Sequence, residues 1–167
     1  GDLYVEQLVR RARHIEVQIL GDLDNVIQLG TRDCSVQRRH QKILEIAPAV
    51  LESEVEQRIL ESAVAVARNA NYRGAGTMEF LVDLDGDDPA AIAFIEGNAR
   101  IQVEHTITEE VTGIDLVAAQ IEIAAGARLV DLGLATSPPV SGFAVQARVN
   151  MERMAVDGTV KPTAGTL

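Results

Sequence analysis

Polar and apolar residues alternate over residues 94–105, FIEGNARIQVEH, in a way that an ordinary core strand does not need. In an extended chain successive side chains point to opposite faces, and neighbours on one face lie about 6.6 Å apart. The pattern predicts a strand whose polar face carries Glu96, Asn98, Arg100, Gln102 and Glu104. A half-solvated strand is the plain alternative. Two carboxylates, two amides and an arginine in line favour a site that holds an anion and a cation together.

Shorter alternations predict antiparallel hairpins. Ile15, Val17 and Ile19 alternate with polar residues before a turn at residues 21–25, and the apolar pattern then resumes at residues 26–29. Residues 77–82 alternate in the same way, and a polar loop at residues 83–91 returns the chain as a strand over residues 92–95. Glu79 and Glu96 are therefore expected on neighbouring strands.

Two stretches have the period of a helix. In the first, apolar residues recur at every fourth position, at Leu51, Val55, Ile59, Ala63 and Ala67, and the helix should end by residues 72–74. Asp115 can cap the second, which has Leu116, Ala119 and Ile123 on one stripe and is closed by Gly126. Thr106 and Glu109 have the spacing of a capping box between these helices.

Composition narrows the class of protein. The chain has 167 residues, 47% apolar and 24% charged, as in a soluble globular protein with one core, and no apolar run approaches the roughly 18 residues of a membrane span. The single Cys34 excludes an internal disulfide framework and is expected to be a reduced structural thiol. The chain begins at Gly1 and ends after a Gly/Thr-rich stretch, which predicts a piece of a longer protein.

Charge points to a local anion site. A net charge of −10 argues against non-specific nucleic-acid binding, which needs many lysines and arginines. A nucleoside triphosphate needs only a local cluster, and Arg38, Arg39, His40 and Lys42 provide one. A solvated basic turn is the alternative. The chain has no glycine-rich phosphate loop, because GAG at residues 74–76 precedes a strand and not a helix.

The sequence resembles the biotin carboxylase family of ATP-grasp enzymes, found in acetyl-CoA, propionyl-CoA, pyruvate and urea carboxylases. RIQVEH at residues 100–105 is the most specific motif, and residues 32–49, 72–80 and 108–117 also match in the family's order. The resemblance implies an α+β fold with an antiparallel sheet flanked by helices. It also implies that residues 1–130 are part of an ATP-grasp domain, that the Gly/Pro-rich residues 131–142 are a linker, and that residues 143–167 begin the biotin carboxylase C-terminal domain.

The resemblance also implies the site residues. The positions that match ATP-binding residues are Glu6, Gln7, Val9, His14, Gln37, His40 and Lys42, with Gln7 standing where a lysine is usual. Those that match metal ligands for Mg²⁺ or Mn²⁺ are Glu79, Glu96 and Asn98; two carboxylates suit an ion that bridges phosphates, although a structural ion pair is an alternative. Those that match bicarbonate or biotin ligands are Arg100, Gln102, the Val103 amide and Arg148. A guanidinium suits a planar anion.

The implied reaction is the MgATP- and bicarbonate-dependent carboxylation of biotin through carboxyphosphate. Glu104 matches the general base, and Arg148 matches an arginine that stabilises the biotin enolate, with an exposed strand arginine as its alternative; Arg100 and Lys42 complete the implied catalytic set. The implied partners are a biotin carboxyl carrier domain and a carboxyltransferase, in an oligomeric parent in the cytoplasm or mitochondrial matrix. Without the family's lid and neighbouring domains, the fragment alone is expected to be inactive. Another ATP-grasp carboxylate–amine ligase and a non-catalytic interaction fragment are the alternatives.

Overall fold

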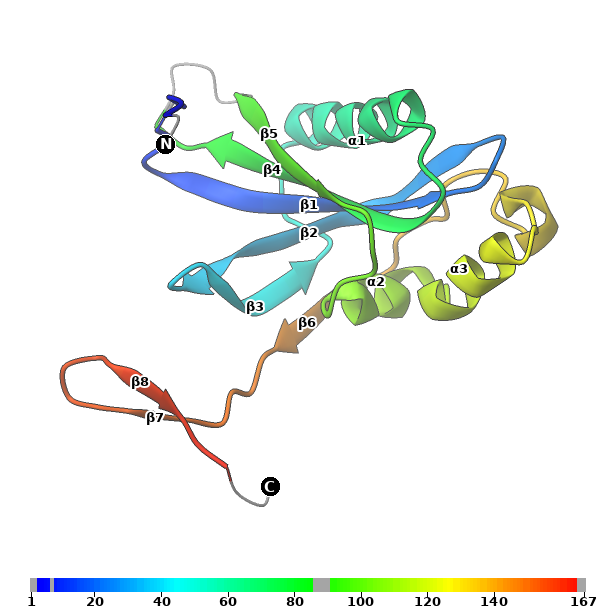
Figure 1. The fold of residues 1–167 in the computed structure, drawn as a ribbon. Helices are drawn as coiled ribbons and strands as arrows, with labels where there is room; N and C mark the ends of the chain where they lie inside the picture. Colours follow the sequence, from blue (N-terminus) through cyan, green and yellow to red (C-terminus); the bar gives the residue numbers. More distant parts are fainter. Residues whose placement is uncertain (1–2, 7, 86–90, 165–167) are drawn as a thin grey trace.

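A computed structural model describes residues 3–6, 8–85 and 91–164, so Gln7 and most of the predicted loop at 83–91 lie outside the described residues. Its main element is a six-stranded antiparallel sheet in the order β5-β4-β1-β2-β3-β6 (Figure 1). The strands are β1 (Ala12–Gly21), β2 (Val26–Arg38), β3 (Gln41–Ala47), β4 (Gly74–Asp83), β5 (Ile92–Asn98) and β6 (Ala144–Ala147). The predicted α+β fold, an antiparallel sheet flanked by helices, is confirmed.

Both predicted hairpins are present. β1 pairs with β2 around a turn that Asp22 holds, since its Oδ1 accepts hydrogen bonds from the amides of Asp24 at 2.7 Å and Asn25 at 2.6 Å. β4 pairs with β5, and Glu79 lies directly opposite Glu96, as the alternation predicts. Strand β1 is buried on both faces, because helices cover each side of the sheet.

Helix α1 (Ser53–Asn69) covers one face, where its residues Val55, Ile59, Ala63 and Ala67 pack on β1 and β4. The predicted period-four stripe is therefore confirmed. The opposite face packs on α3 (Leu116–Ala124) and the short 3₁₀ helix η1 (Leu129–Leu132). Asp115 caps α3 as predicted, since its Oδ1 accepts a hydrogen bond from the Ala118 amide at 2.8 Å.

The prediction of one continuous strand over residues 94–105 is wrong. Strand β5 ends at Asn98, a turn follows at residues 103–104, and α2 (His105–Thr112) begins directly after it. The carbonyl of Gln102 accepts the His105 amide at 3.2 Å, which closes this turn. The apolar phase is not buried either, since Ile95 on the edge strand β5 is nearly half exposed and Val103 is more exposed still.

The capping box predicted at Thr106 and Glu109 is also absent, because α2 starts two residues earlier than that box requires, with Glu104 at its N-cap position. Thr106 lies within the helix and donates to Gln146 Oε1 on β6 at 2.6 Å. The carboxylate of Glu109 instead accepts the Leu116 amide at 2.7 Å, and so links α2 to the start of α3.

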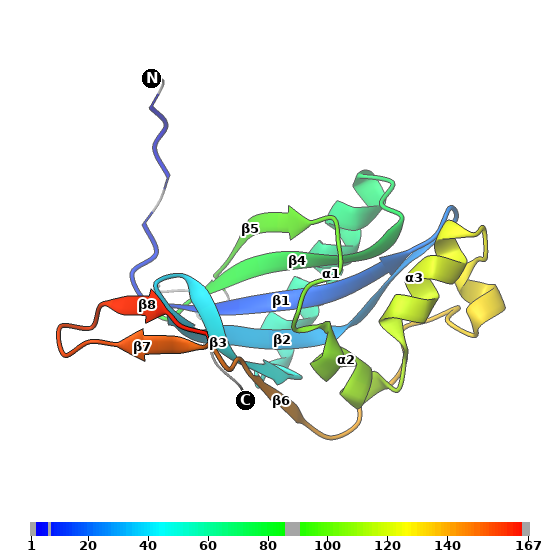
Figure 2. The same cartoon turned by 60° about the horizontal axis from the view of Figure 1, so that its bottom comes forward.

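The C-terminal part of the chain returns to the main sheet. Strand β6 pairs with β3 from Leu44↔Ala147 to Ala47↔Ala144. A small separate hairpin of β7 (Glu152–Met154) and β8 (Val160–Pro162) then extends beyond β3 (Figure 2). The division predicted at residues 131–142 stays a prediction. None of the described helices is long and apolar enough to cross a membrane.

Candidate functional site

A pocket of about 620 Å³ opens over the polar face of β4, β1 and β3. Most of the residues predicted for the site line it, namely His14, Gln37, His40, Lys42, Glu79, Glu96, Asn98, Arg100, Gln102, Val103, Glu104 and Arg148. These side chains come from five segments that are separate in the sequence. The antiparallel sheet and the turn before α2 bring them together.

Glu6 and Val9 do not line the pocket. They belong to a segment without sheet hydrogen bonds that extends away from the sheet before β1 (Figure 2). Gln37 and His40 do reach the pocket, Gln37 from the end of β2 and His40 from the tight turn that leads to β3. Gln37 Nε2 lies 2.9 Å from His14 Nδ1, which fixes both side chains at this end.

Two carboxylates and an amide form the end of the pocket beside β5. Asn98 Nδ2 lies 2.8 Å from Glu79 Oε1 and 3.0 Å from Glu96 Oε1, so the amide bridges the two carboxylates. Glu79 is buried, whereas Glu96 is exposed. Carboxylates with room for water and phosphate oxygens are the ligands that Mg²⁺ prefers. These residues fit such an ion, with the amide turned to present its oxygen.

Glu79 is held in its charged form. Burial alone would raise the pKa of Glu79, but hydrogen bonds from His14 and Gln102 and the charge of Lys42 outweigh burial and lower the pKa to about 2. His14 Nε2 lies 2.5 Å from Glu79 Oε2. His14, Glu16 and Glu79 also lie close enough together to share a metal ion, a set that the sequence did not indicate.

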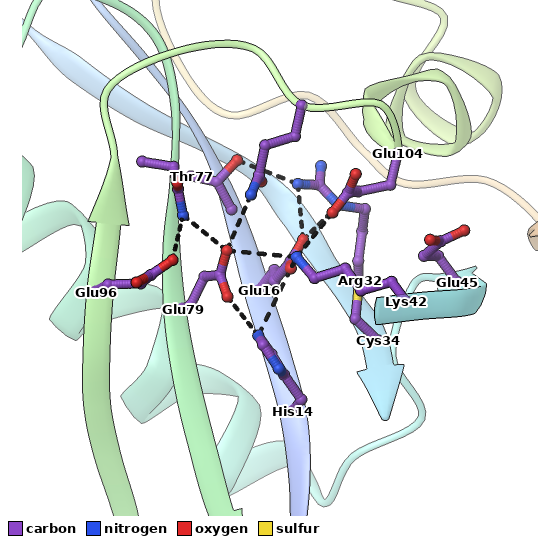
Figure 3. A network of polar contacts seen from close by, with 12 residues as sticks. His14, Glu16, Arg32, Cys34, Lys42, Glu45, Thr77, Glu79, Glu96 and Glu104 are labelled. Carbon is purple, nitrogen blue, oxygen red and sulfur yellow. Dashed lines mark hydrogen bonds and ion pairs between the residues drawn. The ribbon is translucent and has the colours of Figure 1, made fainter. Parts of the chain in front are cut away.

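Lys42 occupies the centre of the pocket, among three glutamates. Its Nζ contacts Glu16, lies 3.3 Å from Glu79 Oε1 and donates to Glu104 Oε1 at 2.8 Å (Figure 3). One ammonium thus faces three carboxylates in a site that is largely shielded from water. A flexible lysine of this kind can exchange a carboxylate partner for a phosphate oxygen.

The end of the pocket beside α2 contains Glu104 and Arg148. Arg148 Nη2 donates to Glu104 Oε2 at 2.8 Å, and Arg148 Nε donates to Glu45 Oε1 at 2.6 Å. Burial alone would raise the pKa of Glu104, but the hydrogen bond and charge of Lys42, with a smaller effect of Arg32, lower it below its usual value. Glu104 is therefore ionised at neutral pH, the state that a proton acceptor needs.

The predicted anion holders lie between these ends. Arg100 is exposed, and Val103 is exposed beside it at the turn. Gln102 is buried and donates through Nε2 to Glu79 Oε1 at 2.9 Å. Its Oε1 has no hydrogen-bond partner in the described part of the chain. A buried amide oxygen without a donor favours a ligand that can supply one.

Several buried polar residues beneath the pocket escaped the sequence analysis. Arg32 has no exposed surface, and it donates to Glu16 at 3.1 Å, Gln18 at 2.7 Å and Thr108 at 3.0 Å. Burial lowers the pKa of Arg32 from its usual value, although nearby glutamates oppose that shift. The sequence did contain a signal for Glu16: it is one of the polar residues that alternate with Ile15, Val17 and Ile19 on β1. In the register of β1 and β4, Glu16 lies opposite Glu79.

Cys34 lies in the same buried layer. Burial raises the pKa of its thiol far above the usual value, so the thiol stays protonated. This agrees with a structural thiol and gives it none of the thiolate character of a nucleophile.

The fold is that of an ATP-binding domain. Residues 1–132 match the family described as carbamoyl-phosphate synthase L chain, ATP binding domain, and the chain belongs to this family. Within it, the chain is a segment of the biotin carboxylase type, as the resemblance implied. It is 58% identical over 156 residues to pyruvate carboxylase of Aspergillus niger, a match that covers 91% of this chain and 13% of that protein.

Solved structures agree with this assignment. The biotin carboxylase domain of a single-chain bacterial carboxylase superposes with a TM-score of 0.80 at 53% identity, over 87% of this chain and 34% of that one. The biotin carboxylase domain dimer of Hydrogenobacter thermophilus 2-oxoglutarate carboxylase, in complex with MgADP, ADP and bicarbonate, gives a TM-score of 0.79 at 44% identity, over 88% of this chain and 32% of that one. This chain therefore spans a small part of the proteins it matches.

Proposed function

We propose that this chain is the part of a biotin carboxylase that binds MgATP and bicarbonate and carboxylates biotin through carboxyphosphate. One observation carries the proposal: a single pocket places two carboxylates suited to a divalent cation at one end and an ionised glutamate between a lysine and an arginine at the other. The relative solved with MgADP and bicarbonate supports the same ligands for this pocket.

At the nucleotide end, Glu79, Glu96 and Asn98 would hold Mg²⁺ or Mn²⁺. The ion, when bound, would supply positive charge that neutralises the phosphates. Lys42 would turn from its glutamates toward the phosphates, and Gln37, beside His14, would face the ribose. The charged side chains line the pocket before any ligand arrives. Once the ligands are bound, these side chains therefore need to move little during the reaction itself.

At the bicarbonate end, Arg100, Gln102 and the Val103 amide would hold the anion. Glu104 would then remove the hydroxyl proton of bicarbonate while the bicarbonate oxygen attacks the γ-phosphorus and ADP leaves. Carboxyphosphate breaks down to CO₂ and phosphate, and this phosphate would take the N1 proton of biotin so that the nitrogen can attack CO₂. Biotin, when bound, supplies the nitrogen that accepts the carboxyl group, and Arg148 would stabilise the negative charge that develops on its ureido oxygen.

The final acceptor would be chosen outside this segment. Pyruvate carboxylase and 2-oxoglutarate carboxylase are both similar to the chain along most of its length, although their names give different acceptors. The biotin carboxyl carrier domain, the carboxyltransferase, an oligomeric parent and a location in the cytoplasm or mitochondrial matrix are parts of the same proposal. Pyruvate is the first acceptor to test, since the curated relative named above is a pyruvate carboxylase.

The test uses the full-length protein that contains this segment. ATP cleavage is measured with free biotin, with and without bicarbonate, and with labelled bicarbonate to follow carboxybiotin. We expect cleavage that requires Mg²⁺ and bicarbonate and rises with biotin. Cleavage that ignores bicarbonate and instead requires a carboxylate and an amine would assign the pocket to another ATP-dependent ligase.

A further inference from the structure

Glu45 lies behind the pocket and not in its wall. It is on β3, has no exposed surface and is absent from the residues that line the cavity. Its Oε1 accepts the Nε hydrogen of Arg148 at 2.6 Å. Its Oε2 has no partner in the described part of the chain. Burying a carboxylate with a hydrogen-bond partner for only one of its two oxygens costs free energy. Some other contribution of Glu45 must therefore offset this cost.

Holding the strands together is not a sufficient reason. Glu45 on β3 and Gln146 on β6 are already partners in a backbone ladder that runs from Leu44 to Ala47. The Arg148 amide also donates to the Ile43 carbonyl at 2.9 Å, which continues that ladder past the end of β6. The ion pair therefore adds little to the pairing of these strands. Its specific effect is on the position of the Arg148 guanidinium.

That guanidinium is shared between two carboxylates. Nε is held by Glu45, Nη2 is held by Glu104 at 2.8 Å, and Nη1 makes no hydrogen bond or ion pair in the described part of the chain. Glu104 is the proton acceptor in the proposed reaction and Arg148 stabilises an anion, so their contact must loosen as the substrates bind. The bond to Glu45 uses a different nitrogen of the guanidinium, Nε, and can persist while Nη2 changes partner.

We propose that Glu45 is a positioning residue for Arg148: it anchors the guanidinium by Nε from behind, so that the Nη atoms can exchange Glu104 for the reacting anion. This inference rests on the proposed function. Without the Glu45 charge, Glu104 is the only carboxylate in contact with Arg148 among the described residues. The arginine would then stay on the proposed base and lie out of place for biotin.

The test is Glu45→Gln in the full-length protein, which keeps the size of the side chain and removes its charge. Biotin-dependent turnover should fall about 10²-fold, the usual effect of misplacing a reacting group by about 1 Å. The KM for ATP should not change, because Lys42, Glu79 and Glu96 are untouched. Bicarbonate-dependent ATP cleavage without biotin should fall much less. Glu45→Asp, which keeps the charge on a shorter arm, should recover part of the turnover.

A matched control is Asp33→Asn. Asp33, on strand β2, also accepts a hydrogen bond from an arginine, Arg13 on β1, at 2.7 Å, and it does not line the pocket. The Asp33→Asn variant removes the same charge from the same sheet, and its turnover should stay near that of the wild type. If both variants lose turnover equally, the effect of Glu45 is general to the fold and the inference is wrong.

A double-mutant cycle separates positioning from folding. In an Arg148→Met background, Glu45→Gln should lower turnover by about two-fold or less, since the residue acts through Arg148. The same change should raise the melting temperature, because it removes a buried charge that lost its partner. A full 10²-fold loss in both backgrounds would overturn the inference. If the wild type is active and Glu45→Gln is fully active too, only the inference about Glu45 is wrong. If the wild type shows no bicarbonate-dependent ATP cleavage, the proposed function is wrong as well.

Discussion

The charge of Glu79 should make a measurable, pH-dependent contribution to stability. Its pKa falls from an ordinary 4.5 to about 2 in the folded chain, a difference of about 2.5 units. At about 1.36 kcal/mol per unit this corresponds to about 3 kcal/mol, and the residue is buried enough for little of it to be screened by water. Between pH 4.5 and 2 the unfolded chain binds the proton and the folded chain does not. The contribution is therefore complete above pH 5 and is lost as the pH falls toward 2.

Glu79→Gln removes the charge and should cost about 3 kcal/mol at pH 7, but progressively less in acid. Urea denaturation of the 167-residue chain, followed by circular dichroism at pH 7, 5, 4 and 3, measures the difference between wild type and variant, so that other titrating groups cancel. Glu61→Gln, on the exposed side of α1, is the control and should show no difference at any pH. If the difference in unfolding free energy between wild type and Glu79→Gln stays constant from pH 7 to 3, the contribution of Glu79 comes from packing and not from its ionisation.

Three further predictions concern the full-length protein. Glu104→Gln keeps the shape but cannot accept a proton, so turnover should fall roughly 10²- to 10⁴-fold with ATP binding nearly unchanged; near-normal turnover would refute the assignment of the base. Arg100→Lys keeps the charge and loses the fork of two donors, so the apparent KM for bicarbonate should rise first, and an unchanged KM would remove Arg100 from the anion site. Glu96→Gln removes one carboxylate from the metal set, so half-maximal activity should require more Mg²⁺, and an unchanged Mg²⁺ titration would assign Glu96 to structure.

The elements that the sequence predicted well are those with one buried face and one clear period. The stripe from Val55 to Ala67 could face only the core, and the hairpin that pairs Glu79 with Glu96 followed from two alternating runs and a polar loop. The alternation after Asn98 gave a wrong prediction because a polar residue at every second position is also compatible with a turn. In the structure, Gln102 and Glu104 still line the pocket, at the turn before α2.

The buried charges could not be read from the sequence. Glu16 and Arg32 lie at the polar positions of alternating strands, where side chains normally face water. Only the packing of α2 and α3 on that face of the sheet shows that both are buried. Arg148 is 44 residues from Glu104, and its place in the site depends on β6 returning to pair with β3. Long-range pairing of this kind leaves no local pattern in the chain. The resemblance to a family supplied what periodicity could not.

The buried groups form a line of alternating charge, from Arg32 through Glu16, Lys42, Glu104 and Arg148 to Glu45. Burying so many charges is a weak means of stabilising a fold, since apolar residues in their place are often as stable or more so. Their arrangement makes better sense for binding. A chain with a net charge of −10 repels anions at long range. Here Lys42 and Arg148 are already held by carboxylates, so an arriving anion replaces one anionic partner with another, and these cations need not be gathered from solvent. The negative net charge and an anion-binding pocket are therefore compatible, because the site works by exchange of partners at fixed cations.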